Sequence, residues 1–227
     1  MTSDIKKFPR TKHIINLGSA SRDDLIFDSK GVAEMLSNNV IVEEKVDGAN
    51  MGLSLGENGM IRAQNRSHFV DSTYHEQFKL LGKWINKHSE ELTNIFSLGD
   101  YIIYGEWLYM QHSINYIKLP DYFLIYDIYD KTTNSFLARH IVTEMLKDTT
   151  LKQVPIIFEG EITIDKLKTM VQSQSKFYDG PVEGIYVRAI CDDFVKYRGK
   201  IVRHNFISGN DHWTKGKYVI NTIIDQY

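Results

Sequence analysis

Short apolar runs of strand length recur along most of the chain and are separated by Gly, Pro, Asn and Asp residues. The runs are rich in β-branched and aromatic residues, which is typical of β-strands. They cover residues 40–46, 51–55, 60–64, 101–107, 122–129, 154–158, 182–189 and 193–203. A break is expected near Gly199 within the last run, and Gly56-Glu57-Asn58-Gly59 predicts a hairpin between the second and third runs.

A helical period replaces the strand pattern in three places. Thr73 and Glu76 have the spacing of a capping box, and the apolar residues behind them share one helix face until Gly99. This pattern predicts a helix over 74–96. Two shorter helical patterns follow around residues 141–146 and over 163–171, the second with Thr163 as its N-cap. Together these elements predict an α+β fold in which antiparallel sheets are flanked by helices.

The sequence shows no sign of a second domain. Its 227 residues are 42% hydrophobic, which is enough for one sizeable core. Only four prolines occur, with no low-complexity tract and no internal repeat, so no segment has the composition of a linker. We therefore expect a single domain over 1–227, in which the last eleven residues show no clear pattern.

The charges of the chain nearly cancel. Lys and Arg number 27 and Asp and Glu 29, which gives a net charge of −2. Nothing global therefore draws the protein to nucleic acid or to anionic lipid, and any site for a polyanion must be a local patch.

The sequence has no feature of a secreted or membrane-spanning protein. No apolar stretch follows the charged N-terminus, and no apolar run approaches the roughly 18–20 residues that cross a bilayer. The single cysteine, Cys191, excludes an internal disulfide framework and is expected as a small residue near a strand end. We expect an intracellular, cytoplasmic protein without a membrane partner.

Lys45 stands at the end of a β-branched run, directly before the turn-forming pair Asp47-Gly48. Such a lysine would lie at the rim of a pocket. The segment alone is weak evidence, because Asp-Gly marks many turns and a strand-end lysine is usually a solvated charge.

Two carboxylates placed inside apolar strands strengthen the case. Glu106 lies in an aromatic strand and Glu183 begins an apolar one, and carboxylates in such places need a partner. One alternative is that they form structural ion pairs with Arg66 or with the cations downstream. Those cations, Lys196 to Lys200, recur with period two, so on one continuous strand they share a face that suits a phosphate chain.

In this order the residues resemble the covalent nucleotidyltransferases, the superfamily of polynucleotide ligases and messenger-RNA capping enzymes. The segments that carry the resemblance are Lys45-Val46-Asp47-Gly48, Gln64-Asn65-Arg66-Ser67, Tyr104-Gly105-Glu106, Phe123 to Asp127, Glu183-Gly184 and Lys196 to Lys200. Within the superfamily the chain is most similar to ATP-dependent RNA ligases of the phage nick-sealing type and their small bacterial relatives. Asn50 supports this, as do Val202-Arg203-His204-Asn205-Phe206 and His212-Trp213.

The sequence departs from the superfamily pattern in two respects. The last motif is usually a pair of lysines two apart, whereas Lys196, Arg198 and Lys200 offer two registers. Only 27 residues follow Lys200, too few for the barrel domain of the oligonucleotide-binding (OB) type that DNA ligases and capping enzymes append. The resemblance thus implies a nucleotidyltransferase (ATP-grasp-like) catalytic domain without an appended OB barrel.

The resemblance implies a three-step reaction. Lys45 attacks the α-phosphorus of ATP, the AMP passes to an RNA 5′-phosphate, and a neighbouring 3′-hydroxyl displaces AMP. An ordinary lysine with a pKa of about 10.4 is protonated at neutral pH, so desolvation, a metal or nearby cations must favour the neutral amine. Arg66, Lys200 and Mg²⁺ are the candidates.

The resemblance also implies roles for the remaining residues. Glu44, on the opposite strand face from Lys45, would contact the adenine edge, and Val46 would line the nucleotide site. Asn50 and Arg66 would hold ribose or phosphate. The other implied contacts are Tyr126 stacking on adenine with Asp127 beside it, Glu106 and Glu183 holding Mg²⁺ (or Mn²⁺) directly or through water, and Lys196, Arg198 and Lys200 contacting phosphate. Tyr126 is equally consistent with a core aromatic.

Other functions remain open at this point. A DNA ligase or a GTP-dependent capping transferase of the same superfamily is disfavoured by the missing barrel. A non-catalytic nucleic-acid-binding module is disfavoured by the intact lysine and carboxylates, and by a charge that gives no spare electrostatic affinity. The histidines from His68 to His212 show no ligand spacing with the carboxylates, so we expect them at the surface or on helices and predict no zinc site.

Overall fold

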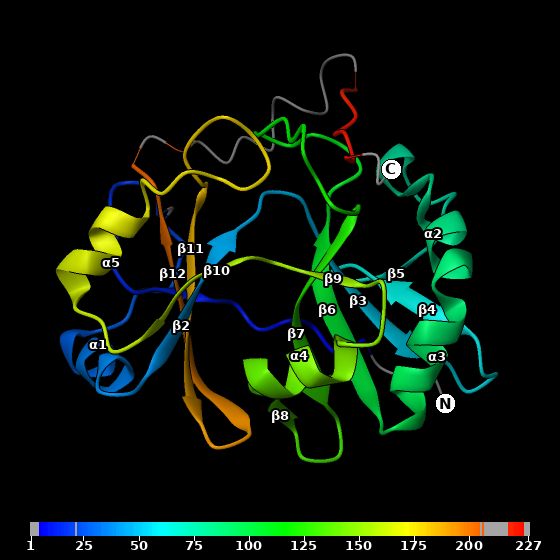
Figure 1. The fold of residues 1–227 in the computed structure, drawn as a ribbon, viewed down its shortest axis with the longest axis horizontal. Coiled ribbons are helices and arrows are strands. Elements are labelled where there is room, and N and C mark those ends of the chain that lie inside the picture. The colour runs from blue at the N-terminus through cyan, green and yellow to red at the C-terminus, as the bar shows by residue number, and fades with distance from the viewer. Residues whose placement is uncertain (1–4, 21, 205, 207–217, 225–227) are drawn as a thin grey trace.

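The protein is built from two β-sheets that stand side by side, each with helices on its outer side (Figure 1). The computed structural model describes residues 5–20, 22–204, 206 and 218–224. The first sheet lies on the left of Figure 1 and the second in its centre and right. This architecture confirms the predicted α+β fold with antiparallel sheets flanked by helices.

The first sheet has the strand order β1-β12-β11-β2-β10. Its strands are β1 (Lys12–His13), β2 (Val40–Lys45), β10 (Ile156–Gly160), β11 (Gly184–Cys191) and β12 (Phe194–Val202). All neighbours are antiparallel except β1 and β12, which are parallel. β2 is therefore an interior strand, between β11 and β10, and it carries Lys45 at its end.

The second sheet has the order β5-β4-β3-β6-β7-β8, with β9 added in parallel to β7. Its strands are β3 (Ala49–Leu55), β4 (Ile61–Gln64), β5 (Phe69–Val70), β6 (Tyr101–Trp107), β7 (Phe123–Asp130), β8 (Ser135–Phe136) and β9 (Lys152–Gln153). Only Val46, Asp47 and Gly48 separate β2 from β3, so the chain passes from one sheet to the other directly after Lys45.

Helices cover the outer side of each sheet through apolar contacts. On the first sheet lie α1 (Ser29–Leu36) and α5 (Ile164–Met170), whose Met35 and Leu167 pack with Val42 and Val187. On the second lie the 3₁₀ turn η1 (Glu76–Phe78), α2 (Leu81–Lys87), α3 (Ser89–Ser97) and α4 (Arg139–Leu146). Each sheet therefore has its own core on its outer side, and a smaller aromatic cluster that contains Tyr104 and Tyr129 packs with Phe8 of the N-terminal segment.

All eight predicted strands form, with ends shifted by a few residues. The predicted hairpin is confirmed, since the Gly56 N–H donates to the Met60 carbonyl at 2.8 Å and Gly59 has a φ of 74°. The break expected near Gly199 is wrong, because β12 continues through it with Lys12 and Val187 as neighbours. A Cβ there would lie 2.4 Å from Ile14 Cγ1, so this glycine allows close packing.

The single helix predicted over 74–96 is also wrong, because the segment forms η1, α2 and α3. The chain leaves the helical path at His88, whose φ and ψ are −104° and 11°. The imidazole is buried, with Nδ1 2.8 Å from Glu91 Oε2 and Nε2 3.5 Å from Asp121 Oδ2. These contacts override the helical pattern and show that this histidine is not at the surface.

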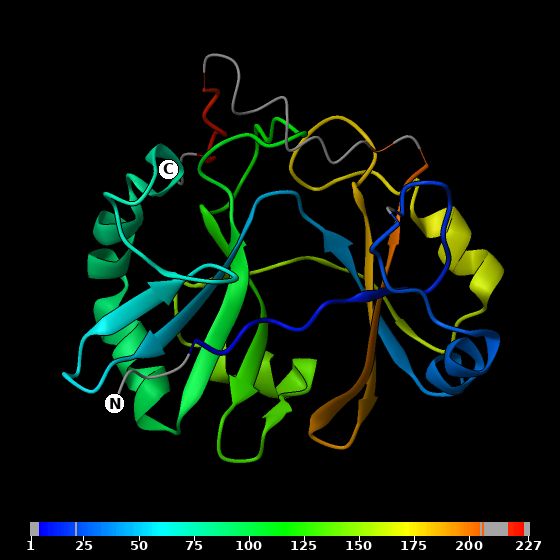
Figure 2. The ribbon, with the colours of Figure 1, turned by 180° about the vertical axis from the view of Figure 1, so that it is seen from behind.

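Helix α1 and the path of the N-terminal segment were not predicted from the sequence. Asp28 caps α1 by accepting a hydrogen bond from the Gly31 N–H at 2.7 Å, a signal that the sequence contains. Before it, residues 5–11 cross from the second sheet to the first, as the dark blue segment in Figure 2 shows. No periodic pattern marks that crossing.

The remaining expectations concern Cys191, membrane-spanning helices, residues near the C-terminus and the number of domains. Cys191 ends β11 and is exposed, as expected for a small strand-end residue. Within the described residues, no helix is long and apolar enough to cross a membrane. The loop over 208–211 and His212-Trp213 lie outside the described residues, and the single-domain expectation stays a prediction.

Candidate active site

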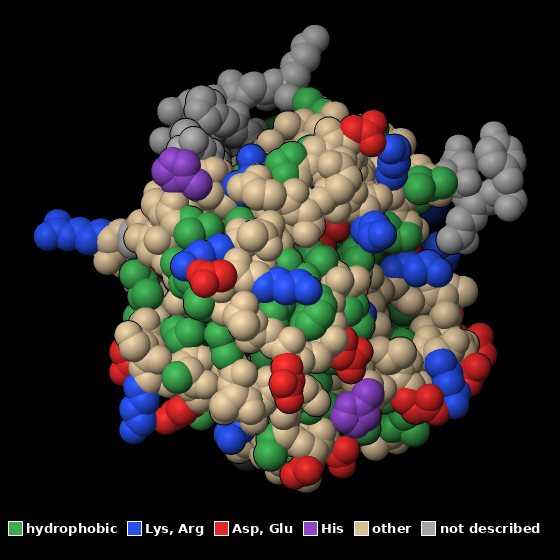
Figure 3. Space-filling model, turned by 60° about the vertical axis from the view of Figure 1, so that its left-hand side comes forward, with side chains coloured by type: hydrophobic (Ala, Val, Ile, Leu, Met, Phe, Trp, Pro, Cys, Tyr) green, Lys and Arg blue, Asp and Glu red, His purple; other side chains and the backbone are tan. Residues whose placement is uncertain are grey.

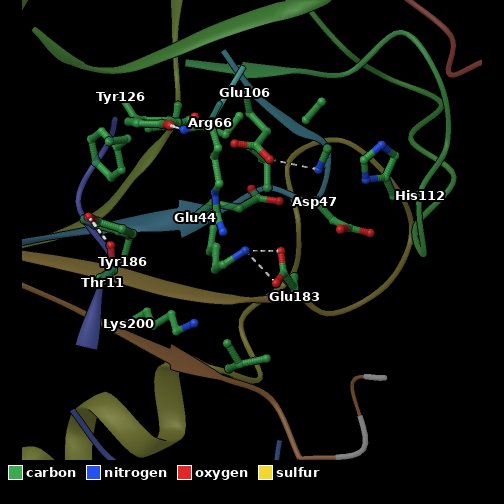
Figure 4. Close-up of a pocket in the computed structure, with 18 of the residues that line it drawn as sticks. Thr11, Glu44, Asp47, Arg66, Glu106, His112, Tyr126, Glu183, Tyr186 and Lys200 are labelled. Carbon is green, nitrogen blue, oxygen red and sulfur yellow. Dashed lines mark hydrogen bonds and ion pairs between the residues drawn. The ribbon is translucent and has the colours of Figure 1, made fainter. Parts of the chain in front are cut away.

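A cavity of about 680 Å³ opens between the two sheets. Its walls come from β2 and β11 of the first sheet, β3 and β6 of the second, and the N-terminal segment. Figure 4 shows carboxylates and cations pointing into this space from both sides. The cavity brings together residues that are far apart in sequence.

Lys45 reaches into the cavity from the last position of β2. Its Nζ lies 2.6 Å from Glu183 Oε1 and 2.7 Å from Glu183 Oε2, so it contacts both carboxylate oxygens. Glu183 is placed by Gly184, which pairs with Lys45 in the sheet. A Cβ on Gly184 would lie 2.3 Å from the Ile201 carbonyl, so only glycine permits this approach of β11 to β12.

Lys45 is held protonated in this arrangement. Burial acts to lower its pKa, but the carboxylates of Glu183 and Glu106 outweigh burial and raise the pKa above the usual value. The amine therefore becomes a nucleophile only when this negative charge is compensated by another cation.

Glu106 faces the same space from β6, and its Oε1 accepts a hydrogen bond from the Gly48 N–H at 3.2 Å. Burial raises its pKa to about 8, although Lys45 acts in the opposite direction. Burial likewise raises the pKa of Glu183 to about 7, again against the pull of Lys45. The buried carboxylate of Glu183 and the partly buried carboxylate of Glu106 thus both act on one lysine.

The donor set fits a hard divalent cation bound together with phosphate. Mg²⁺ is usually held by one or two carboxylates plus substrate oxygens and water, and Glu106 and Glu183 supply two carboxylates that line the same cavity. Among the described residues, no three His, Cys, Asp or Glu side chains are grouped to hold a metal by themselves. Such a cation would therefore depend on the substrate.

Glu44 and Val46 flank Lys45 and both line the cavity. The Glu44 carboxylate accepts hydrogen bonds from the Ser175 hydroxyl at 2.5 Å and the Lys176 N–H at 3.1 Å. Burial raises the pKa of Glu44, and the Ser175 hydrogen bond partly offsets that effect. Its oxygens already have protein donors, so an adenine contact would share them.

Tyr126 and Arg66 lie together at one part of the cavity, as Figure 4 shows, and Asn50 lines the same cavity. The Asn50 amide donates a hydrogen bond to the Tyr126 hydroxyl. Arg66 acts electrostatically on both Tyr126 and Glu106, whose pKa it lowers. The structure therefore groups these three residues as the sequence analysis expected, while their contacts with a nucleotide stay a prediction.

Asp127 lies away from the cavity wall, in a buried ionic network. Its Oδ1 is 3.1 Å from Arg188 Nε, and its Oδ2 is 3.7 Å from Arg198 NH1. Glu43 pairs with the same Arg188 and with Arg139. The network joins the two sheets, so Asp127 reaches the site only through other side chains.

The three cations of β12 for which phosphate contacts were expected have different surroundings, and of the three only Lys200 lines the cavity. Lys200 lines the cavity, with Nζ 3.2 Å from Asp24 Oδ1. Arg198 instead stacks on Phe136 at 3.6 Å and faces Asp127, while Lys196 is exposed. A strand advances roughly 6.6 Å for every two residues, which separates the three side chains along β12, and their contacts with phosphate stay a prediction.

Several cavity residues were missed in the sequence. Tyr186 lies inward on β11, Thr11 and Phe8 come from the crossing N-terminal segment, and His112 lies in the segment between β6 and β7. Burial lowers the pKa of His112, which was expected at the surface or on a helix and is instead a partly buried residue outside the helices. The alternation of β11 was a usable signal for Tyr186, whereas the other three depend on long-range contacts.

Asp47 fixes the segment that carries His112. Its Oδ2 accepts hydrogen bonds from the Ser113 N–H at 2.6 Å and the Ile114 N–H at 3.2 Å. Its own N–H donates to the Tyr116 hydroxyl at 2.9 Å. The turn after Lys45 and the segment after β6 are therefore one bonded unit.

A comparison with known families now assigns the chain. The model of the RNA ligase family matches residues 38–202, which is well over half of the sequence. The chain belongs to the RNA ligase family. The match spans every segment that carried the resemblance to the covalent nucleotidyltransferases, and it confirms that resemblance. No curated protein matches the chain.

Solved structures of Naegleria gruberi RNA ligase have the same fold. A point variant of it without ligand aligns with a TM-score of 0.65 and 18% identity over 87% of this chain and 55% of that one. A variant with ATP and Mn gives 0.64 and 18% over 88% and 56%, and the enzyme with PPi gives 0.61 and 19% over 87% and 56%. This chain thus spans little more than half the length of that ligase.

Proposed function

We propose that this chain is an ATP-dependent RNA ligase that carries AMP on Lys45. The observation that supports this most is the contact of Lys45 with both oxygens of Glu183 inside a cavity shared by the two sheets. A solvated strand-end lysine would not be enclosed in this way. The alternative of a non-catalytic binding module gives no reason for two carboxylates that line one cavity with a lysine.

The first step is nucleotidyl transfer to the lysine. The neutral Nζ attacks the α-phosphorus of ATP, a P–N bond forms, the α–β P–O bond breaks and pyrophosphate leaves with its electron pair. Arg66 and Lys200, which line the cavity from opposite sheets, are placed to compensate charge on the phosphates. Because these two cations lie on both sides of the cavity, they favour binding of a triphosphate between them.

Glu106 and Glu183 are the residues that would hold Mg²⁺ or Mn²⁺. When bound, the cation supplies charge compensation for the triphosphate and relieves the negative charge that keeps Lys45 protonated. Until then, Glu183 keeps the Lys45 ammonium oriented through its two contacts.

The next two steps move AMP to the RNA 5′-phosphate and then join the ends. An oxygen of the 5′-phosphate displaces Lys45 from AMP, which forms a P–O–P bond. The adjacent 3′-hydroxyl then attacks the 5′-phosphorus, loses its proton and releases AMP. The product is an ordinary phosphodiester.

We infer RNA as the polymer from the family and from the character of the surface. The face drawn in Figure 3 carries Lys and Arg interspersed with Asp and Glu, in line with the net charge of −2. Because non-specific electrostatic binding of nucleic acid is weak, contacts at the break determine which polymer is bound. The 2′-hydroxyl is the group that distinguishes RNA there. A DNA ligase or a GTP-dependent capping transferase remains the alternative activity.

The test is sealing of four matched nicked duplexes, with ribose or deoxyribose on either side of the break. We expect a preference for ribose on the 3′-hydroxyl side and more tolerance on the 5′-phosphate side. Equal rates on all four, or a preference for the all-DNA duplex, would contradict the RNA ligase assignment. Covalent labelling of the protein by radiolabelled GTP, and not by radiolabelled ATP, would indicate the capping alternative.

A further inference from the structure

Residues 6–11, which we call the N-terminal strap, run from the second sheet to the first (Figure 2), and Phe8, Pro9 and Thr11 of this strap line the cavity. At one end, the Lys6 carbonyl accepts hydrogen bonds from Gln64 Nε2 at 2.7 Å and from the Tyr104 hydroxyl at 2.5 Å, both in the second sheet. At the other end, the chain continues into β1, which pairs with β12 of the first sheet. The strap therefore has fixed contacts on both sides.

Phe8 of the strap supports Tyr126. The two ring centroids are 5.2 Å apart with an interplanar angle of 72°, and Tyr104 lies 5.1 Å from Phe8 on the same sheet. Such edge-to-face packing holds an aromatic ring in one orientation. Phe8 is only partly buried by these contacts and forms part of the cavity wall.

Thr11 of the strap supports Tyr186. The two hydroxyl oxygens are 2.9 Å apart, and the pair is drawn as a dashed line in Figure 4. The ring of Tyr186 rests on the Arg188 guanidinium, whose central carbon is 4.3 Å from the ring centroid. Both the hydroxyl and the ring of Tyr186 are therefore fixed, as they are for Tyr126, whose hydroxyl accepts from Asn50.

Two fixed tyrosines thus project into one cavity from different sheets, and the strap contacts both. We propose that the N-terminal strap is part of the nucleotide-binding site, where Phe8 and Thr11 position Tyr126 and Tyr186 to hold the nucleobase. This inference rests on the proposed function, since it takes ATP as the ligand. Stacking of a base on an aromatic side chain contributes substantially to affinity, so loosening either ring weakens binding of the base.

If the strap positions these tyrosines, changes in it should weaken binding of the base and leave binding of the phosphates unchanged. ATP and inorganic tripolyphosphate share the phosphate chain, but only ATP carries a base. We would measure the affinity of both for the full-length Lys45→Ala protein, in which no transfer to Lys45 occurs, by calorimetric titration with Mg²⁺ present. Phe8→Ala, Thr11→Val and Thr11→Ser would be added singly to this background.

We expect Thr11→Val to lower the affinity for ATP about five- to tenfold, which is the effect of one lost hydrogen bond. Phe8→Ala should lower this affinity at least about tenfold. Thr11→Ser retains the hydroxyl and should bind ATP like the parent. Tripolyphosphate should bind all of them equally. Lys7→Ala is the matched control, because Lys7 is exposed on the same strap and does not line the cavity.

Unchanged ATP affinity in both Phe8→Ala and Thr11→Val would overturn the proposal, as would an equal loss of tripolyphosphate binding, which indicates general loosening of the fold. If Phe8→Ala does not fold, Phe8→Leu replaces it. If the parent binds ATP but the native protein never forms a covalent adduct, the ligase proposal fails while the strap is still tested. If the parent binds no ATP, the strap proposal fails.

Discussion

Glu106 should make the protein less stable as the pH rises, and its removal should reverse that trend. Burial raises the Glu106 pKa from its usual 4.5 to about 8 in the folded protein. The folded state therefore binds a proton more tightly than the unfolded state, and the free energy of unfolding falls with pH between these two values. For this one group, the fall between pH 5 and pH 8 amounts to about 3 kcal/mol.

The replacement Glu106→Gln removes this titration and keeps an oxygen that can accept from the Gly48 N–H. We expect its free energy of unfolding, relative to the native protein, to rise by about 2–4 kcal/mol from pH 5 to pH 8. The assay is urea unfolding at four pH values with EDTA. Glu159→Gln, at an exposed position of β10, is the control. Parallel stability curves for Glu106→Gln and the native protein would refute the reasoning.

Two further replacements separate chemistry from stability. Glu183→Gln should slow adenylylation about 10²–10³-fold in a single-turnover assay, because it removes a charge at the reacting centre; an unchanged rate with a lowered melting temperature would instead indicate a structural ion pair. Glu43→Gln should cost about 3–5 kcal/mol in urea unfolding, because it leaves Arg139 and Arg188 with an uncompensated buried charge. Glu57→Gln, exposed in the hairpin turn, is its control, and equal losses in both would contradict the network's role.

The lysine and its carboxylates could be predicted from sequence because the signals are local. Lys45, Glu106 and Glu183 each sit at the end of, or within, an apolar run, and a buried charge in such a run requires a partner. The runs also predicted eight strands of the two sheets, but not the two-residue strands β1, β5, β8 and β9. What the runs do not contain is the pairing of distant segments that closes the cavity.

What could not be predicted has physical reasons of the same kind. The period of Lys196, Arg198 and Lys200 correctly puts them on one strand, but it does not show which of them lines the cavity, because the contact of Arg198 with the ring of Phe136 joins distant segments. The helix break at His88 depends on Asp121, far along the chain. Thr11 and Tyr186 are 175 residues apart, so no local pattern reveals their contact.

The central claim is that Lys45 becomes covalently adenylylated. The most direct measurement is the intact mass of the purified protein after incubation with ATP and Mg²⁺, with Lys45→Ala measured beside it. The account predicts that the native protein gains the mass of one AMP and that folded Lys45→Ala gains none. A native protein of unchanged mass, or a Lys45→Ala protein that still gains AMP, would contradict it.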